Sequence, residues 1–330
     1  MLQRILSFLF TLPMILMTMS DADRPGAKVE VNPNATNPYI AQYGKPMVSA
    51  HRSGGGLAPE NTLMAVEACL KAKNFSIDIF EFDVKLTKDG QLVVLHNPTY
   101  DATSNAEEAF GHPYVMPSMY TLEQLQAKLN LGENFQVNGK YPYRGLRGDK
   151  IPKNLRVVEV GALLSYIEKA SKKDYCYIIE IKDGFFDGIR SADRLYSILR
   201  DLKLLDRVIV GTFWPFLPYY MDWRYPDMAR SASIFECLQF YFYARANLPF
   251  SGLNAKYVAL QIPGDENEMP WPLNQVNLTT REVINYAHKN NVAVQYWTVN
   301  NEDNARMLRD NGGDAMMSDY PDMICRVYGY

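Results

Sequence analysis

Three carboxylates and two histidines lie in or directly after predicted β-strands, where together they could bind a cation and transfer protons. Glu81 and Asp83 lie two residues apart in a run with the pattern of a β-strand, and Glu180 lies in a second such run. His51 and His96 each follow a short apolar run directly. Alternate residues of a strand share a face, so Glu81 and Asp83 point the same way. Carboxylates suit a hard cation, and imidazoles suit proton transfer.

Carboxylates on one inward face repel one another unless positive charge balances them, because each buried ion is costly to desolvate. Two arrangements satisfy this requirement. The oxygen atoms could hold Mg²⁺ or Ca²⁺, with water or substrate completing the coordination shell. Alternatively, Lys182, which shares an inward face with Glu180, could join Arg52 in a salt-bridge network.

The two strand-end histidines favour catalysis. A single histidine at a strand end is more often structural, but two beside three carboxylates are harder to explain in that way. One imidazole can accept a proton from the attacking group while the other donates a proton to the leaving group. We take His51 as the base and His96 as the acid, although the residues leave this order open. His112 and His288 receive no role.

Short apolar runs alternate with amphipathic stretches from residue 46 onward, which is typical of a TIM (β/α)8 barrel. The expected strands are Met47–Ala50, Ile77–Val84, Leu92–Leu95, Tyr175–Ile181, Val208–Thr212, Ala229–Ile234, Tyr257–Gln261 and Val292–Trp297. The expected helices are Thr62–Lys73, Val160–Lys172, Ile189–Leu202, Thr280–Asn290 and Glu302–Asp310. The turn at 88–90 predicts a hairpin, and residues 314–317 could form another strand, so the closing register is open.

The orientation of the acidic residues follows from the barrel. Phe80, Phe82 and Val84 suit packing against outer helices, which directs Glu81 and Asp83 inward. The carboxyl ends of barrel strands form the functional rim. The five chemical groups are therefore expected to meet there.

Residues 97–154 interrupt the alternation and predict an insertion on the rim, with one helix near Thr121–Leu129. Its basic residues Arg144, Arg147 and Lys150 could approach an anionic substrate, but a solvated surface is the more common use of such residues.

Composition excludes several classes of protein. The chain has 330 residues, 47% hydrophobic and 22% charged, with a formal net charge of −3. These values exclude disordered, collagen-like and multi-span membrane proteins. Nucleic acid is not an expected partner, because binding phosphate backbones needs a cationic excess. Four cysteines without a C-x-x-C pair argue against a zinc site or a dense disulfide framework.

The first 22 residues are expected to be a secretory signal peptide. An apolar run at 5–17 follows Arg4 and is too short to cross a bilayer comfortably. Secreted, periplasmic or extracellular localisation is therefore expected, with an uncleaved membrane anchor as the alternative. Residues 23–45 are polar and predict a tether, and 46–325 form the catalytic domain.

Two aromatic clusters follow expected strands, and we expect burial for most of their side chains. The alternative is an exposed rim that contacts an acyl chain or a membrane surface. The clusters are Phe213, Trp214, Phe216, Tyr219, Tyr220 and Trp223, then Phe240, Tyr241, Phe242, Tyr243 and Phe250.

An ordered set of motifs resembles the glycerophosphodiester phosphodiesterase family, within the phospholipase C-like phosphodiesterase superfamily. The set is His51-Arg52-Ser53-Gly54-Gly55-Gly56-Leu57-Ala58-Pro59-Glu60-Asn61-Thr62, Glu81-Phe82-Asp83-Val84, Thr87-Lys88-Asp89-Gly90, Val94-Leu95-His96, Glu180-Ile181-Lys182, Trp297-Thr298-Val299-Asn300 and the segment 313–322. It spans residues 47–322. The sequence departs from the family pattern at Ser53, Asn97 and Ala102, none of which removes a histidine or one of the three candidate cation ligands.

The resemblance implies a TIM barrel with an insertion, and a divalent cation held at the Glu81, Asp83 and Glu180 positions. It also implies catalytic histidines at the His51 and His96 positions. Arg52, Lys182 and Trp297 are the expected substrate and phosphate contacts, and Glu60 is a further candidate.

The function implied is hydrolysis of a glycerophosphodiester to sn-glycerol 3-phosphate and an alcohol, with a phosphodiester as the small-molecule substrate. A phospholipase D-like hydrolase of lysophospholipids or sphingolipids is the alternative if the aromatic rim is exposed. A non-catalytic surface protein is disfavoured by the intact histidines and carboxylates.

Overall fold

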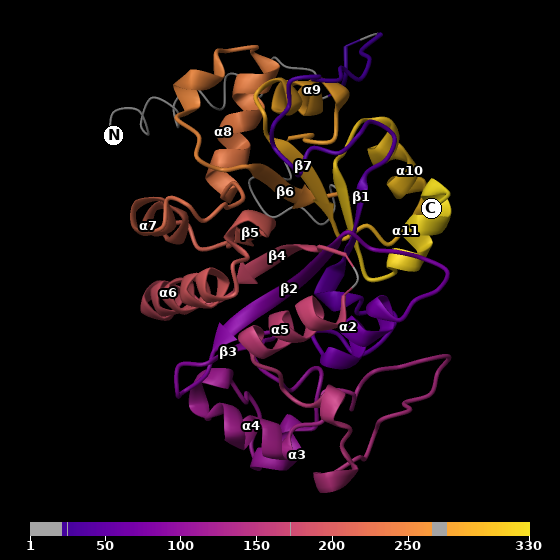
Figure 1. The fold of residues 1–330 in the computed structure, drawn as a ribbon, viewed down its shortest axis with the longest axis vertical. Coiled ribbons are helices and arrows are strands. Elements are labelled where there is room, and N and C mark those ends of the chain that lie inside the picture. Colours follow the sequence, from indigo (N-terminus) through magenta and orange to yellow (C-terminus); the bar gives the residue numbers. More distant parts are fainter. Residues whose placement is uncertain (1–21, 25, 172, 266–275) are drawn as a thin grey trace.

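The computed structural model describes residues 22–24, 26–171, 173–265 and 276–330, in which parallel strands curve into a barrel surrounded by helices (Figure 1). Neighbouring barrel strands follow the order β5-β4-β2-β1-β8-β7-β6. These strands are β1 (Met47–Ala50), β2 (Ile79–Leu86), β4 (Cys176–Ile181), β5 (Val208–Gly211), β6 (Ala259–Pro263), β7 (Ala293–Trp297) and β8 (Ala315–Ser318).

A two-residue segment closes the barrel between β5 and β6. Arg230 forms a parallel bridge with Val210, and Ser231 forms one with Ala259. The expected strand at 229–234 is therefore reduced to two bridges. It cannot extend further because Ser233 caps the helix that follows, accepting a hydrogen bond from the backbone N–H of Glu236.

The hairpin and the further strand left open by the sequence are both present. Strand β3 (Leu92–Val94) pairs antiparallel with β2 and lies outside the ring of barrel strands. Strand β8, at the expected position near 314–317, pairs with β1 and β7 inside the barrel. The predicted TIM-type fold is confirmed, with β8 rather than β3 completing the ring.

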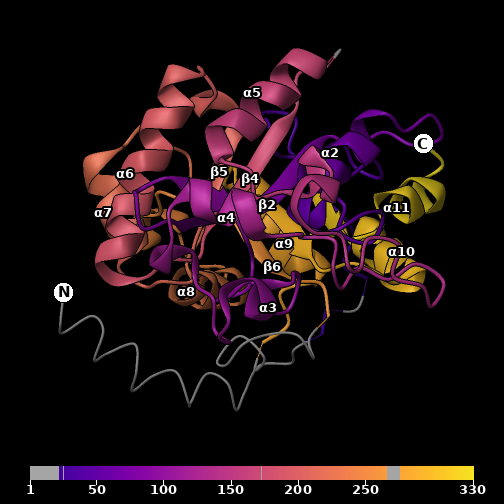
Figure 2. The same cartoon turned by 90° about the horizontal axis from the view of Figure 1, so that it is seen from below.

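Helices cover the outside of the barrel, as Figures 1 and 2 show. None of the helices in the described part of the chain is long and apolar enough to cross a membrane. The outer helices are α2 (Leu63–Leu70), α5 (Val160–Ala170), α6 (Phe185–Asp201), α7 (Leu217–Arg224), α8 (Ile234–Arg245), α9 (Arg281–Lys289), α10 (Glu302–Asp310) and α11 (Pro321–Tyr328).

The strands bury two different faces, as their alternation predicts. Phe80, Phe82 and Val84 of β2 belong to the large core between the barrel and the outer helices. Ile79 of β2 and Ile178 of β4 belong instead to a smaller cluster inside the barrel. Because alternate residues share a face, Glu81, Asp83 and Glu180 lie on the inner side.

The segment expected to be a tether lies against the amino-terminal end of the barrel. Tyr39 is buried in the inner cluster with Ile79 and Ala315. The backbone N–H of Ala41 donates to Asp314, and Asn37 donates to the carbonyl of Val258. Polar side chains fix this segment because they pair with backbone groups left at the strand ends. The expected signal segment falls in residues 1–21, outside the described residues, apart from its last residue.

The insertion at 97–154 forms a lobe at one end of the molecule, beyond the β2–β3 hairpin (Figure 1). It contains α4 (Leu122–Lys128), close to the predicted helix, and a short α3 (Ala106–Phe110) that was not predicted. Arg147 is paired with Glu108 and Glu133 within the lobe. This pairing favours the structural use of that basic residue.

Arg230 joins α7 to α8, so replacing it tests how much this contact stabilises the fold. Its buried guanidinium binds Asp222 of α7 and Glu236 of α8, with N–O distances of 2.7 and 2.8 Å. We expect Arg230→Ala to lower the free energy of unfolding by about 3–5 kcal/mol, because it leaves two carboxylates without their partner. Urea unfolding measures this loss. As a control, Arg326→Ala removes an exposed pair and should cost below about 1 kcal/mol; equal losses would contradict the assignment.

Candidate active site

One cavity of about 160 Å³ opens among the carboxyl ends of the barrel strands. Eight of the nine site residues expected from the sequence line it, and Glu60 does not. Those eight are His51, Arg52, Glu81, Asp83, His96, Glu180, Lys182 and Trp297. Residues that lie far apart in the sequence therefore meet as the barrel predicts.

His51 begins a tight turn directly after β1. The two residues that follow, Arg52 and Ser53, have φ values of 48° and 66°, so the chain reverses in the left-handed region. The His51 ring is fixed through Nδ1, which lies 2.8 Å from Asp319 Oδ1. Asn300 in turn donates to the other oxygen of Asp319 at 2.6 Å. The segment containing Asp319 was recognised in the sequence, but its contact with His51 was not.

The charges around His51 favour its protonated form. Burial opposes this, but the negative charge of Glu81 and the hydrogen bond with Asp319 raise the pKa of His51 above its usual value. Nε2 lies 3.9 Å from Glu81 Oε2 and lines the cavity. The ring thus turns one nitrogen towards Asp319 and the other towards the carboxylates.

His96 follows β3, also lines the cavity and has a different environment. Its Nδ1 lies 3.1 Å from the side-chain oxygen of Asn97, which is a neutral amide. Burial, followed by the positive charges of Lys182 and Arg52, lowers its pKa in spite of the attraction of Asp83. The two histidines therefore differ in proton affinity because their partners differ.

The acidic residues are buried close together. Burial and the charge of Asp83 raise the pKa of Glu81 to about 8, although Glu81 accepts the backbone N–H of Arg52 at 2.7 Å. Burial also raises the pKa of Glu180 to about 7. The pKa of Asp83 is instead lowered, because the positive charges of Lys182 and the histidines outweigh its burial. Glu81 and Glu180 are therefore the carboxyl groups that are costly to ionise without further positive charge.

Lys182 lies between two of the carboxylates. Its Nζ is 3.1 Å from Asp83 Oδ1 and 2.8 Å from Glu180 Oε1. Over the described ranges, no group of three or more His, Cys, Asp or Glu side chains is arranged so that it could hold a metal ion as it stands. The salt-bridge arrangement considered from the sequence is therefore present for Lys182.

Asp83 has a second partner, Asn61, whose Nδ2 donates to Asp83 Oδ2 at 3.1 Å. Asn61 directly precedes the expected helix at Thr62–Lys73, a position where asparagine often caps a helix, but it does not cap α2. Thr62 caps α2 by accepting the backbone N–H of Ala65, while Asn61 turns inward with a φ of 54°. Two adjacent residues could both cap a helix, and the pattern did not distinguish them.

The remaining expected residues complete the wall. Arg52 Nη1 binds Glu60 at 3.0 Å, so Glu60 contacts Arg52 and does not line the cavity itself. Trp297 ends β7 and packs edge to face with Phe213, their ring centroids 5.9 Å apart. His112 and His288 lie outside the cavity and bind Tyr120 and Asp314.

The two aromatic clusters differ in their exposure to solvent. Phe240, Tyr241 and Phe242 of α8 are buried, as expected for core residues. In the first cluster, Phe213, Phe216, Tyr219 and Trp223 are exposed, which corrects the expectation of burial there. Phe213 is the only member of the first cluster among the described residues that line the catalytic cavity.

Comparison with known proteins gives a consistent result. The model of the Glycerophosphoryl diester phosphodiesterase family matches residues 51–182 and 218–323. A glycerophosphodiester phosphodiesterase from Caldanaerobacter subterraneus subsp. tengcongensis is 26% identical over 286 residues, which cover 86% of this chain and 98% of the relative.

Solved structures share the fold at lower identity. A phosphodiesterase from Oleispira antarctica, in complex with the product sn-glycerol-3-phosphate, has a TM-score of 0.61 at 18% identity and covers 86% of this chain and 97% of its own. A glycerophosphodiester phosphodiesterase from Agrobacterium tumefaciens has a TM-score of 0.60 at 17% identity, with coverages of 86% and 100%. With the family model matched over most of the barrel, the chain belongs to the glycerophosphoryl diester phosphodiesterase family.

Proposed function

We propose that this protein is a metal-dependent glycerophosphodiester phosphodiesterase, which hydrolyses its substrate to sn-glycerol 3-phosphate and an alcohol. Family membership and the names of the relatives support the reaction class. The observation that carries the proposal is the cavity itself, where His51, His96, three carboxylates and two cationic side chains converge. The solved Oleispira relative contains sn-glycerol-3-phosphate as its product, which supports the same product here.

The donor set fits a divalent cation. Glu81 and Asp83 are buried, and the pKa of Glu81 is raised by burial and by the charge of Asp83, so added positive charge would relieve their repulsion. Glu81, Asp83 and Glu180 would hold the ion by their hard oxygen atoms, after Lys182 withdraws from Asp83 and Glu180. When bound, Mg²⁺ or Ca²⁺ supplies charge neutralisation for the phosphodiester.

The cationic side chains are suited to binding the phosphate. Arg52 and Lys182 line the cavity, and each is already paired with acidic groups on one side. Their other donors can approach phosphate oxygens, where they stabilise negative charge as it grows in the transition state. Trp297 presents an apolar wall for the glycerol carbons.

The histidines transfer the protons. His51, held by Asp319, is placed to accept the proton of the attacking hydroxyl, which comes from water or from the substrate's own glycerol. The charge of Glu81 raises the pKa of His51 in the metal-free protein, and a cation bound at Glu81 would offset that charge and favour the neutral ring that a base requires. His96 is placed to donate a proton to the alcohol as it leaves. The fixed orientation of His51 through Nδ1 leaves Nε2 for this exchange, as in other histidines oriented by a carboxylate.

Hydrolysis of glycerophosphocholine by the purified protein tests the proposal. We expect release of choline and sn-glycerol 3-phosphate, loss of this activity with EDTA, and recovery on adding Mg²⁺ or Ca²⁺. Activity that persists fully after exhaustive chelation would contradict the metal requirement. Absence of hydrolysis with both metals present, across several head groups, would contradict the reaction class.

We also propose that the protein is exported, on the basis of the basic residue and apolar run within the first 22 residues. Detection of a shortened mature chain outside the cytoplasm of the producing cell would support this proposal. An amino terminus that remains intact inside the cell would contradict it.

A further inference from the structure

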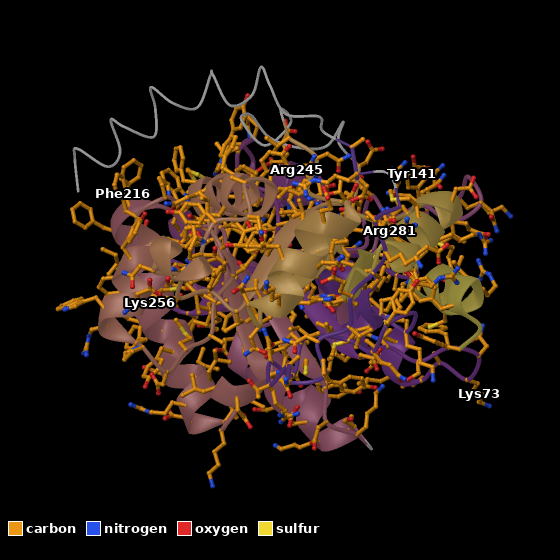
Figure 3. The ribbon with its side chains drawn as sticks, turned by 90° about the horizontal axis from the view of Figure 1, so that it is seen from above. Lys73, Tyr141, Phe216, Arg245, Lys256 and Arg281 are labelled. Atoms are coloured by element: carbon orange, nitrogen blue, oxygen red, sulfur yellow. The ribbon has the colours of Figure 1, made fainter. Side chains whose placement is uncertain are left out.

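The catalytic cavity has a polar wall formed by residues that the proposed reaction does not use. Aromatic side chains such as Phe216 project from the edge of the molecule, as Figure 3 shows, whereas this wall lies inside the barrel. It is formed by Gly211 at the end of β5, Ser231 of the two-residue segment and Gln261 of β6. All three residues line the same cavity as the catalytic groups.

Gly211 keeps a small space open in this wall, which we call the Gly211 notch. A Cβ at position 211 would lie 3.1 Å from Oε1 of Gln261, 3.4 Å from Oγ of Ser231 and 3.8 Å from Cγ of Glu180. These three side chains therefore surround a point at which glycine places no side-chain atom. A glycine inside a strand often marks a site that a ligand approaches closely.

The two polar side chains of the notch have unused hydrogen-bonding capacity. Gln261 donates through Nε2 to Oε1 of Gln295 at 3.0 Å, while its own Oε1 faces the notch. Ser231 is buried, and its hydroxyl forms no hydrogen bond with any part of the chain that the structure describes. Buried polar groups are normally paired, so these two oxygen atoms are suited to binding a ligand.

The amide of Gln261 is held in place from behind. Gln295 lies opposite Gln261 in the pairing of β6 with β7, and its side chain is fully buried. The Nε2 of Gln295 has no hydrogen-bond partner among the described residues. A buried amide that is only partly satisfied lowers stability, so its presence is explained better by the orientation of Gln261 for binding than by packing.

A hydroxyl group is complementary to the notch. It can donate its hydrogen to the carbonyl oxygen of Gln261 and accept the hydrogen of the Ser231 hydroxyl. A quaternary ammonium group, such as that of choline, has no hydrogen to donate. Glu180, whose Cγ borders the notch, also binds Lys182 at 2.8 Å, so the notch lies beside the expected phosphate and cation site.

We propose that the Gly211 notch binds the terminal hydroxyl of the substrate's glycerol. Gln261 and Ser231 are then specificity-determining residues, and Gln295 is a positioning residue for Gln261. The inference rests on the proposed function, because the phosphate must lie beside Lys182. The secondary hydroxyl is closer to phosphorus, so the terminal hydroxyl is the group that extends to a neighbouring strand. An ester at the terminal oxygen has no hydrogen to donate, so the notch favours glycerophosphodiesters over their 1-acylated forms.

Two deoxy analogues of glycerophosphocholine, which lack either the terminal or the secondary hydroxyl, test the notch with the metal-loaded protein. The wild type should prefer glycerophosphocholine over the terminal deoxy analogue by about tenfold or more in kcat/KM. Gln261→Leu and Gly211→Ala should reduce this preference to below about threefold, while the preference over the secondary deoxy analogue stays as in the wild type. Gln42→Leu, at an exposed glutamine outside the cavity, is the matched control and should keep both preferences.

The outcomes separate the two proposals. A wild-type protein that hydrolyses glycerophosphocholine and the terminal deoxy analogue equally well would overturn the role of the notch and leave the proposed function standing. Equal losses of kcat/KM in the variants for all three substrates would also overturn it, because they would indicate a structural role. If none of the three is hydrolysed, the proposed reaction fails, and calorimetric binding of sn-glycerol 3-phosphate and its terminal deoxy form decides the notch: equal affinities would overturn it.

Discussion

A His96→Ala variant should lose about 10²- to 10⁴-fold in kcat towards glycerophosphocholine while keeping its fold. His96 lines the cavity, and its Nδ1 contacts the side chain of the adjacent residue Asn97, so removal leaves no distant partner unsatisfied. Burial, together with the charges of Lys182 and Arg52, lowers the pKa of His96, so its protonated ring gives up a proton readily to an alkoxide. Steady-state kinetics, together with an unchanged unfolding midpoint, check this expectation.

The leaving group distinguishes an acid from a base. A p-nitrophenyl ester of glycerol phosphate releases a stable phenolate, which needs little help from a proton donor. His96→Ala should therefore hydrolyse this ester at close to the wild-type rate, whereas His51→Ala should be impaired with both substrates. His112→Gln, far from the cavity in the insertion, is the control. Near-normal glycerophosphocholine hydrolysis by His96→Ala would refute its role.

A Glu81→Gln variant should lose about 10³-fold in kcat, because binding of the cation supplies several kcal/mol of transition-state stabilisation and each 1.36 kcal/mol is worth about tenfold. Glutamine keeps the volume and can still accept the backbone N–H of Arg52, so the local fold should persist. The variant should also need more metal for half-maximal activity. Metal titrations of both proteins measure this, with Glu107→Gln in the exposed part of the insertion as control.

The same variant has an expected effect on stability. Burial and Asp83 raise the pKa of Glu81 from 4.5 to about 8 in the folded, metal-free protein. The folded state therefore holds this proton more tightly than the unfolded state, and the stability it contributes is present below about pH 4.5 and lost as pH rises towards 8. Glu81→Gln removes this loss, so metal-free unfolding should show the variant gaining stability relative to wild type between about pH 5 and 8. A constant difference across that range would contradict the explanation.

The barrel and the cavity residues could be predicted because both follow from local patterns. The alternation in 80–84 fixes which side chains face inward, and polar residues after short apolar runs mark the strand ends. The ring of strands was less certain, since β3 and β8 have similar patterns and only pairing across the barrel distinguishes them.

Other features depend on contacts that no local pattern contains. Asp319 meets His51 across 268 positions of sequence, and Lys182 reaches Asp83 from a different strand. The exposure of Phe216 could not be inferred from composition, because the similar aromatic run Phe240-Tyr241-Phe242 in α8 is buried. Tertiary packing decides these cases, and it is fixed only when the elements are assembled.

Tyr39 seals the barrel at the end opposite the catalytic groups. Within the described residues, the cavity that holds the catalytic groups lies at the opposite end of the barrel, where we expect substrate to enter and products to leave. An inhibitor large enough to cover the opening of this cavity would not need to reach the phosphate site itself. Such an inhibitor would prevent a product already bound in the cavity from leaving until the inhibitor dissociated.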